Sequence, residues 1–436
     1  MTTQSTPRLR NVWPFWIGAL LWSALAYATL APDESQLALQ GCKGVDGQRE
    51  IYDSNRVRKS LDTAEPDRLL AAPSFPLQLE MRVPFGPTAF PSADHVYLMY
   101  ELHFTNFEMN PVSLRRIEVF DADKKDARPI AALEASELDA LMQVVGSWPS
   151  GGNTDSAELR SGQSEVLFLC IAFKRGAPVP NNLSHRVLTP ESAVEGAVVG
   201  THNTELRVLG PPVKGADWLA SDGPSNDVSN HHRRGLPIFG GRTLISRRYA
   251  IDWQQSENGS TFSGDALDKR SYFAYDQQVV AVADGRIVKV RGGLPENVPG
   301  HDEEFHPAVP ITMRTLAGNF VILDLGKGQF AHYLHLKPGT LRVKAGDRVR
   351  RGQILAKIGS SGDAREPHLH FEVTDSPILM VGEGVPYLMD RYRVKLADDS
   401  WETRTQELPM KDMLIDFRPV DSCRKAKHRS DPCTVR

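Results

Sequence analysis

The chain has 436 residues, of which 41% are hydrophobic and 24% are charged. These values are ordinary for globular protein, and the length is sufficient for two or three domains. Because 51 lysines and arginines nearly balance 54 aspartates and glutamates, for a formal net charge of −3, nothing in the charge balance indicates binding to nucleic acid, and none is expected.

The first segment, residues 1–32, is predicted to be a signal peptide or a membrane anchor. Arg8 and Arg10 precede an apolar stretch, residues 12–30, that contains no charged side chain. Two Ala-x-Ala sequences within this stretch offer cleavage sites, which favours a cleaved signal over a retained anchor. We therefore expect an exported protein of the periplasm or cell envelope, whose membrane contact is made only through this segment.

Residues 73–215 are predicted to form a separate β domain. Segments 77–83, 97–104 and 117–120 alternate apolar and polar residues, as half-buried strands do, and turn-forming residues separate them. Alternating strands need two sheets to bury their apolar faces, so we expect an immunoglobulin-like β-sandwich with one short helix over 136–145. It contains no catalytic cluster, which suggests a spacer or a docking module for an envelope partner protein.

Residues 216–245 are predicted to be a linker, because the stretch 210–230 is rich in Pro, Gly, Ser, Asn and Asp. This segment ends near two adjacent histidines, His231 and His232. Two interpretations stay open for them. One histidine folds back onto the next domain as a metal ligand, or both lie in a solvated loop.

Residues 246–400 are predicted to be a compact antiparallel β domain with a groove. Short Val/Ile/Leu runs are interrupted by glycines, which accept positive φ in tight connections, and no long amphipathic helix pattern is present. A Pro-rich insertion, residues 292–315, is expected to form a long loop at the rim of the groove. Its His301 and His306 are reserve candidates for metal ligands.

The richest motif is Pro-His-Leu-His-Phe-Glu-Val at 367–373. Strand side chains alternate, so His368 and His370 are predicted to point to one face. Asp252 and His335 also lie in apolar, strand-like segments. A catalytic zinc ion binds about three His or carboxylate ligands and keeps one position open for water, while further histidines can move a proton or stabilise the developing charge. These four residues therefore predict a hydrolytic metal site.

Five sequence blocks in one order resemble the lysostaphin-type, or LytM, zinc metallopeptidases (peptidase family M23). The blocks, which include Tyr-x-His-Leu and Val-x-x-Gly-x-x-Val patterns, lie at residues 279–288, 318–324, 333–336, 343–359 and 367–373. Members of that family cut peptide cross-bridges in bacterial peptidoglycan. The resemblance implies a mainly β, lysostaphin-like domain with a duplicated hybrid motif, Zn²⁺ as cofactor and peptidoglycan peptides as substrate.

The resemblance also implies roles for individual residues. Asp252 and His370 correspond to zinc ligands, and His335 and His368 correspond to the catalytic pair. The family's remaining ligand is a His four residues before the Asp, but Arg248 stands at that position. A guanidinium has no lone pair to give to a metal, so the family's site lacks one ligand here.

Two functional hypotheses follow from the missing ligand. In the first, His231 or His232 replaces it, and the chain is a zinc metalloendopeptidase that hydrolyses peptidoglycan cross-links. In the second, the groove is catalytically degenerate and binds a wall peptide or activates a cell-wall amidase. Because the retained histidines and Asp252 would be costly in a groove used only for binding, the first hypothesis is favoured.

Three residues are predicted to bind substrate: Arg248, Asn319 and Tyr333. A guanidinium can grip the carboxylates of a stem peptide with two parallel hydrogen bonds, which suits Arg248 to this role. Asn319 and Tyr333 belong to two of the blocks that carry the resemblance.

The last segment, residues 401–436, is predicted to be a C-terminal extension. Cys423 and Cys433 flank a short polar stretch and could close a small disulfide loop. The other two cysteines, Cys42 and Cys170, cannot be paired from the sequence, and Cys170 is expected in the core because its strand is apolar.

Overall fold

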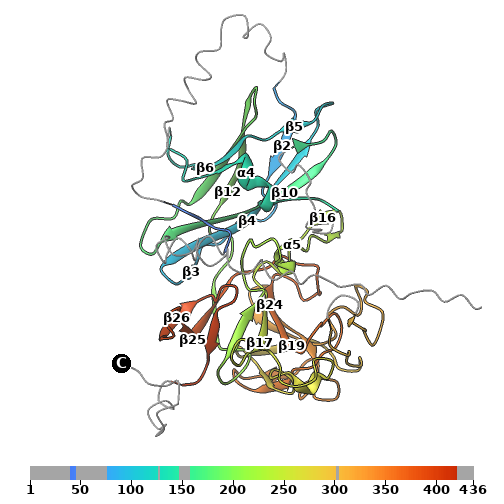
Figure 1. The fold of residues 1–436 in the computed structure, drawn as a ribbon. Coiled ribbons are helices and arrows are strands. Elements are labelled where there is room, and N and C mark those ends of the chain that lie inside the picture. The colour runs from blue at the N-terminus through green and yellow to red at the C-terminus, as the bar shows by residue number, and fades with distance from the viewer. Residues whose placement is uncertain (1–39, 46–75, 126–127, 147–157, 301–303, 420–436) are drawn as a thin grey trace, which may run out of the picture.

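A computed structural model describes residues 40–45, 76–125, 128–146, 158–300 and 304–419 of the chain (Figure 1). The predicted signal or anchor at 1–32 and the predicted disulfide between Cys423 and Cys433 lie outside these residues. Within the described ranges, none of the helices has the length and apolar character needed to cross a membrane.

Two sheets form the N-terminal domain, in the upper part of Figure 1. The six-stranded sheet consists of β1 (Lys43–Gly44), β2 (Leu79–Arg82), β3 (Phe90–Ser92), β4 (His95–Asn106), β8 (Met142–Val144) and β10 (Ser164–Lys174). The four-stranded sheet consists of β6 (Arg116–Asp121), β7 (Ala131–Glu134), β11 (Asn182–Leu188) and β12 (Ala193–Gly200). A pair of short strands, β5 (Val112–Ser113) and β9 (Glu158–Leu159), and the helix α4 (Ala135–Leu141) complete the domain. The helix is shorter than the expected 136–145, because the chain enters β8 at Met142.

Strand β4 is buried on both of its faces, whereas the sequence predicts a half-buried strand. Its even-numbered residues from Leu98 to Phe104 pack in the core between the two sheets of the sandwich. Tyr97 and Met99, on the other face, pack in a core that continues into the C-terminal domain. The half-buried prediction is therefore wrong for β4, because a second domain covers the face expected to meet water.

A single eleven-stranded sheet is the frame of the C-terminal domain, and its strand order is β13-β25-β27-β14-β17-β24-β21-β20-β19-β22, with β26 paired to β25. Its strands are β13 (Arg207–Leu209), β14 (Trp218–Ser221), β17 (Ile251–Gln255), β19 (Gly285–Arg291), β20 (Asn319–Gly326), β21 (Gln329–Leu336), β22 (Arg348–Val349), β24 (Leu369–Thr374), β25 (Tyr387–Lys395), β26 (Trp401–Glu407) and β27 (Leu414–Asp416). Smaller elements are α5 (His231–Arg234), η1 (Lys269–Ser271), and the strand pairs β15 (Ile238–Phe239) with β16 (Arg242–Thr243) and β18 (Gln278–Val280) with β23 (Ile354–Lys357). The predicted mainly β fold with two β domains is confirmed.

The sheet of the C-terminal domain includes strands from outside the predicted range 246–400. Strand β14 lies within the predicted linker 216–245, yet it pairs with β17 on one side and β27 on the other. Strands β26 and β27 lie in the predicted extension 401–436 and also belong to the sheet. Strand β14 has only four residues, of which Trp218 and Ala220 are buried. The sequence does not predict it because turn-forming residues surround it.

One disulfide joins Cys42 to Cys170 on β10, and 128 residues separate the two in the sequence. Cys170 is buried in the core, as its apolar neighbours predict. The pairing escaped prediction because sequence spacing does not report which distant cysteines meet in space.

Candidate metal centre

Asp252 and His370 face each other across two neighbouring strands. The antiparallel register of β17 and β24 places the two residues directly opposite, where side chains on one face come into contact. Nδ1 of His370 lies 2.9 Å from Oδ1 of Asp252, and Nε2 of His368 lies 3.5 Å from the same oxygen. Both histidines therefore reach one face, as strand alternation predicts.

The Asp252 carboxyl group is buried but remains an anion. Burial alone would raise its pKa, yet the neighbouring His232, His368 and His370 imidazoles hold the pKa well below its usual range. A buried carboxylate that meets several imidazoles is a suitable zinc donor.

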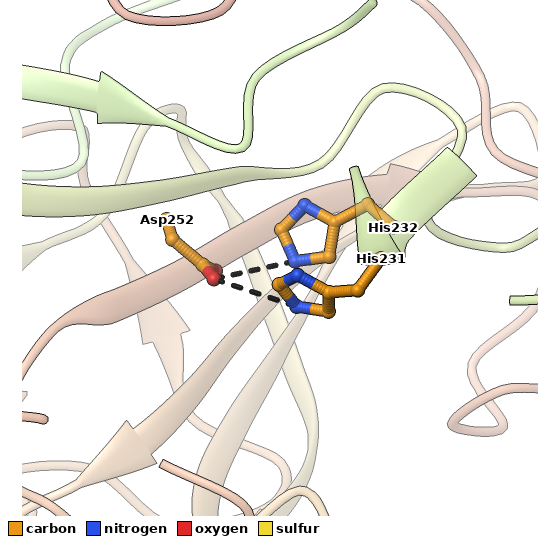
Figure 2. Close-up of side chains that lie close together, drawn as sticks. All are labelled: His231, His232 and Asp252. Atoms are coloured by element: carbon orange, nitrogen blue, oxygen red, sulfur yellow. Dashed lines mark ion pairs between the residues drawn. The ribbon is translucent and has the colours of Figure 1, made fainter. Parts of the chain in front are cut away.

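The helix α5 supplies two more imidazoles to this carboxylate (Figure 2). Nε2 of His232 lies 3.3 Å from Oδ2 of Asp252, and Nε2 of His231 lies 3.8 Å from the same oxygen. The start of the helix is defined by Asn230, whose side-chain oxygen accepts hydrogen bonds from the backbone N–H groups of His232 and Arg233. Both histidines thus fold back onto Asp252, and the solvated-loop interpretation is wrong.

His232 is the better placed of the two as a ligand. Its ring is buried, and Nδ1 lies 2.9 Å from the backbone carbonyl oxygen of Asp222. A carbonyl oxygen only accepts, so Nδ1 donates and Nε2 keeps the lone pair. Burial lowers the pKa of His232 to about 4, which keeps the ring neutral near pH 7. The His231 side chain is 46% exposed and its Nδ1 lies 3.3 Å from the Asp222 carboxylate.

The pairing of His232 with Asp252 shows that the donor set fits a metal ion. The Nε2 lone pair of His232 faces a carboxylate oxygen, and two acceptors at 3.3 Å cannot form a hydrogen bond with each other. Nε2 is also a buried atom without a hydrogen-bond partner. A zinc ion shared by His232, Asp252 and His370 would satisfy these atoms, since neutral imidazole nitrogens and a carboxylate oxygen are zinc donors.

Glu372 lies at Nε2 of His370, the ring nitrogen that does not face Asp252. Its buried carboxylate lies 3.5 Å from Nε2 of His370 and 3.2 Å from Nδ1 of His332. Burial alone would lower the pKa of His370, but hydrogen bonds with Asp252 and Glu372 raise it to about 9. A metal ion at Nδ1 would displace the proton that Nδ1 shares with Asp252, while the Glu372 carboxylate would keep the proton on Nε2.

We expect Glu372→Gln to weaken zinc binding by about 10–100-fold, the usual effect of losing a partner that orients a ligand. The change removes the negative charge that holds the proton on Nε2 of His370 and keeps the side chain's size. Zinc affinity is measured by competition with a chromophoric chelator. Unchanged affinity would show that His370 does not depend on this carboxylate.

His335 and His368 offer two unprotonated nitrogens beside this cluster. Nδ1 of His335 donates to the carbonyl oxygen of Ser361 at 2.8 Å, and Nδ1 of His368 donates to that of Glu366 at 2.8 Å. Nε2 of each ring therefore keeps its lone pair. The two ring centroids are 4.8 Å apart. Burial, together with His368 and His370, holds the pKa of His335 well below its usual range, so the ring is neutral and able to accept a proton.

A β-bulge directs His335 away from the position that a regular strand would give it. The pairing of β21 with β20 shifts between Tyr333, opposite Val321, and Leu336, opposite Asn319. His335 lies in this irregular stretch with φ of 62°, a left-handed backbone that is rare for residues other than glycine. Bulges often re-aim a side chain next to an active site, and strained backbone gathers at functional sites.

Arg248 does not lie in the metal site or in a substrate groove. Its buried guanidinium donates from Nε to both carboxylate oxygens of Glu101, at 3.1 Å each, and from Nη2 to Glu383 at 2.9 Å. Glu101 belongs to β4 of the N-terminal domain. The predicted role in substrate binding is therefore wrong for Arg248, because its hydrogen bonds are used in holding the two domains together.

Asn319 and Tyr333 are also buried, so their predicted contact with substrate is wrong. The Asn319 side chain bonds to the backbone of Leu294 and Leu336. The Tyr333 hydroxyl accepts a hydrogen bond from the backbone N–H of Val282 at 2.9 Å. Both residues stabilise the fold around the site.

The reserve ligands do not contribute to the cluster as far as the structure describes them. His306 is exposed, and among the described residues it is not one of the three, His231, His232 and Asp252, whose possible donor atoms lie within 4.8 Å of one another. His301 falls outside the described ranges.

Sequence reasoning overlooked Asp222 and Glu372. Glu372 could have been found, because it lies two residues after His370 and therefore on the same face of the strand. Asp222 had no such signal, since it follows a strand that was not predicted. The strand register brings Asp222 near the site, because its neighbour Ser221 is paired with Asp252.

A β-sheet face that brings a carboxylate and several imidazoles together has the donor types that metal-dependent hydrolases use. Residues 271–378 match the model of Peptidase family M23, and this part of the chain is an M23 peptidase domain. The matched range contains His335, His368 and His370, whereas Asp252 and α5 lie before it. The resemblance to lysostaphin-type peptidases is confirmed.

Two curated relatives match short parts of the chain. The peptidoglycan DD-endopeptidase ShyB of Vibrio cholerae serotype O1 is 33% identical over 92 residues, which are 20% of this chain and 21% of ShyB. ShyA, a peptidoglycan DD-endopeptidase of the same organism, is 36% identical over 72 residues, 16% of each protein. The matches thus span about a fifth or less of each relative's length.

Among solved structures, the catalytic domain of lysostaphin from Staphylococcus simulans is 21% identical in sequence. The alignment covers 39% of this chain and 84% of that domain, with a TM-score of 0.20. A TM-score of this size does not establish a shared arrangement of the whole chains.

Proposed function

We propose that this chain is a zinc-dependent endopeptidase that hydrolyses peptide cross-links of peptidoglycan. The observation that carries the proposal is the position of His232, whose buried Nε2 lone pair faces the Asp252 carboxylate beside His370. The ligand missing at Arg248 is thereby replaced from α5. The M23 match of residues 271–378 supports a peptidase, and the names of the relatives support the substrate.

The residues divide into a metal-holding set and a proton-transfer pair. His232, Asp252 and His370 would hold the zinc ion, which when bound acts as a Lewis acid and lowers the pKa of water. His335 and His368 present Nε2 lone pairs that can accept a proton from the attacking water and return it to the leaving amine. Each keeps its Nε2 free because a backbone carbonyl holds its Nδ1 proton.

We propose that the protein acts outside the cytoplasm, in the periplasm or cell envelope. The charge and apolar pattern of residues 1–32 supports export. The disulfide between Cys42 and Cys170 supports an oxidising compartment, because disulfides are rare in the cytosol. Peptidoglycan is found in that compartment, so the proposed location agrees with the proposed substrate.

The purified protein is expected to contain about one zinc ion per chain and to cleave cross-linked muropeptides. Treatment with a chelator should abolish cleavage, and added zinc should restore it. Elemental analysis measures the metal, and chromatography of the digested muropeptides measures cleavage. A protein that takes up no zinc, even after reconstitution, would contradict the proposal and favour the alternative, a degenerate domain that binds a wall peptide or activates an amidase.

A further inference from the structure

A single carboxylate of the N-terminal domain lies between the two domains, close to the metal centre. Glu101 is buried on β4, on the same face as Tyr97 and Met99, which is the face covered by the C-terminal domain. It forms ion pairs with two arginines of the C-terminal part of the chain, Arg248 and Arg233. Arg233 is the residue directly after His232 in α5.

Arg233 attaches α5 to the sheet of the sandwich through several bonds. Its fully buried guanidinium pairs with Glu101 and donates from Nη2 to the carbonyl oxygens of Tyr100 on β4, at 3.0 Å, and Leu169 on β10, at 3.2 Å. The next residue, Arg234, accepts at its carbonyl oxygen a hydrogen bond of 3.1 Å from the side chain of Gln143 on β8. Three strands of the N-terminal sheet therefore contact this short helix.

A four-residue helix cannot hold its own conformation in water, because nucleation is unfavourable and so few residues add little propagation. The position of α5 must therefore come from tertiary bonds. The bonds on the other side of the helix are made by Asn230 and by Nδ1 of His232 to Asp222. Without the bonds of Arg233, only the bonds of Arg234 to Gln143 and to the carbonyl oxygen of Ala140 would attach α5 to the sandwich.

We propose that Glu101 is a positioning residue for the zinc ligand His232, so that the N-terminal β-sandwich is a structural part of the metal centre. The inference rests on the proposed function, since it requires that the site bind zinc. The same carboxylate holds Arg248, which stands where the family has its first ligand. The Glu101 side chain therefore has two roles in this proposal. It helps to place the replacement ligand His232 on α5, and it attaches the sandwich to the C-terminal domain.

The charges around Glu101 allow a matched test. Two glutamates, Glu101 and Glu383, are buried with Arg233 and Arg248. The variant Glu101→Gln/Arg233→Gln removes one charge of each sign and breaks the ion pair through which Arg233 attaches α5 to β4. The control Arg248→Gln/Glu383→Gln also removes one charge of each sign but leaves Arg233 paired with Glu101. Neither variant leaves an unbalanced charge, the most costly result of breaking a buried pair.

The measurement is zinc affinity, by competition with a chromophoric chelator, together with the thermal unfolding of each metal-free protein. Glu101→Gln/Arg233→Gln should bind zinc about 10–100-fold more weakly than wild type, as when a partner that orients a ligand is lost. Arg248→Gln/Glu383→Gln should keep the wild-type affinity, even where its unfolding temperature falls by a similar amount. If the first variant does not fold, Glu101→Asp keeps the charge, draws the carboxylate back by one methylene, and should also weaken zinc binding.

The outcomes separate the two proposals. Equal zinc affinity in both double variants, whether retained or reduced, would overturn the role of Glu101 and leave the proposed function standing. In the Glu101→Asp protein, wild-type affinity would overturn it in the same way. A wild-type protein that binds no zinc would overturn both proposals at once.

Discussion

The variant His232→Ala is expected to lose its zinc and its peptidase activity together. It removes one of three ligands, so zinc affinity should fall by more than the roughly 100-fold that the loss of an outer partner can cause. His231→Ala should keep about one zinc per chain, because the His231 ring is half exposed and its Nε2 is farther from Asp252, at 3.8 Å against 3.3 Å for His232. Zinc content is measured by elemental analysis of both proteins.

These two variants control for each other, since they make the same change at neighbouring positions of one short helix. Thermal unfolding of the metal-free proteins shows whether the buried site of His232 loses stability for reasons unrelated to metal. If His231→Ala lost zinc and His232→Ala kept it, the assignment of the replacement ligand would be wrong. If neither lost zinc, His232 would not be a required ligand.

The second expected result separates metal binding from catalysis. His335→Ala and His368→Ala should each retain about one zinc ion and lose turnover by roughly 10²–10⁴-fold, the usual contribution of a residue that transfers a proton. Nδ1 of each ring donates to a backbone carbonyl, which leaves Nε2 to exchange a proton, so either ring can serve as base or acid. Single-turnover hydrolysis of cross-linked muropeptides measures the rate, and elemental analysis measures the zinc.

The exposed His306 supplies the control for this pair, since His306→Ala removes an imidazole of the same domain outside the cluster and should leave turnover unchanged. Loss of zinc from the His368→Ala protein would instead make His368 a ligand, because its Nε2 lies 3.5 Å from Asp252. Retained turnover in both His335→Ala and His368→Ala would contradict their role in proton transfer.

The arrangement around Glu101 changes how the N-terminal domain is understood. From the sequence it is a spacer or docking module, since it has no catalytic cluster. In the structure its sheet is buried against the C-terminal domain, with Tyr97 and Met99 in a shared hydrophobic core. Because Glu101 and the backbone of β4 and β10 also bind Arg233, the domain has a structural role next to the proposed zinc ligand.

Some predictions about the site failed for a common physical reason. The sequence assigns Arg248 to substrate on the chemistry of its guanidinium, and Asn319 and Tyr333 on their places in the motif blocks. Each has a polar side chain that can serve a groove or a buried hydrogen bond equally well. Which of these occurs depends on what packs against the residue, and here Glu101, Leu294 and Val282 supply buried partners.

By itself, the sequence determined the β-rich class, the two domains and the gathering of His335, His368 and His370 with Asp252. These features depend on local patterns, namely strand alternation and the spacing within motifs. Such patterns can be recognised in a short stretch of sequence without knowledge of the tertiary structure. Only the tertiary structure placed His232 nearer than His231 to Asp252, paired Cys42 with Cys170, and placed Arg248 on Glu101. Each of those contacts joins segments far apart in the chain, and their meeting depends on sheet register and domain packing, which local patterns do not encode.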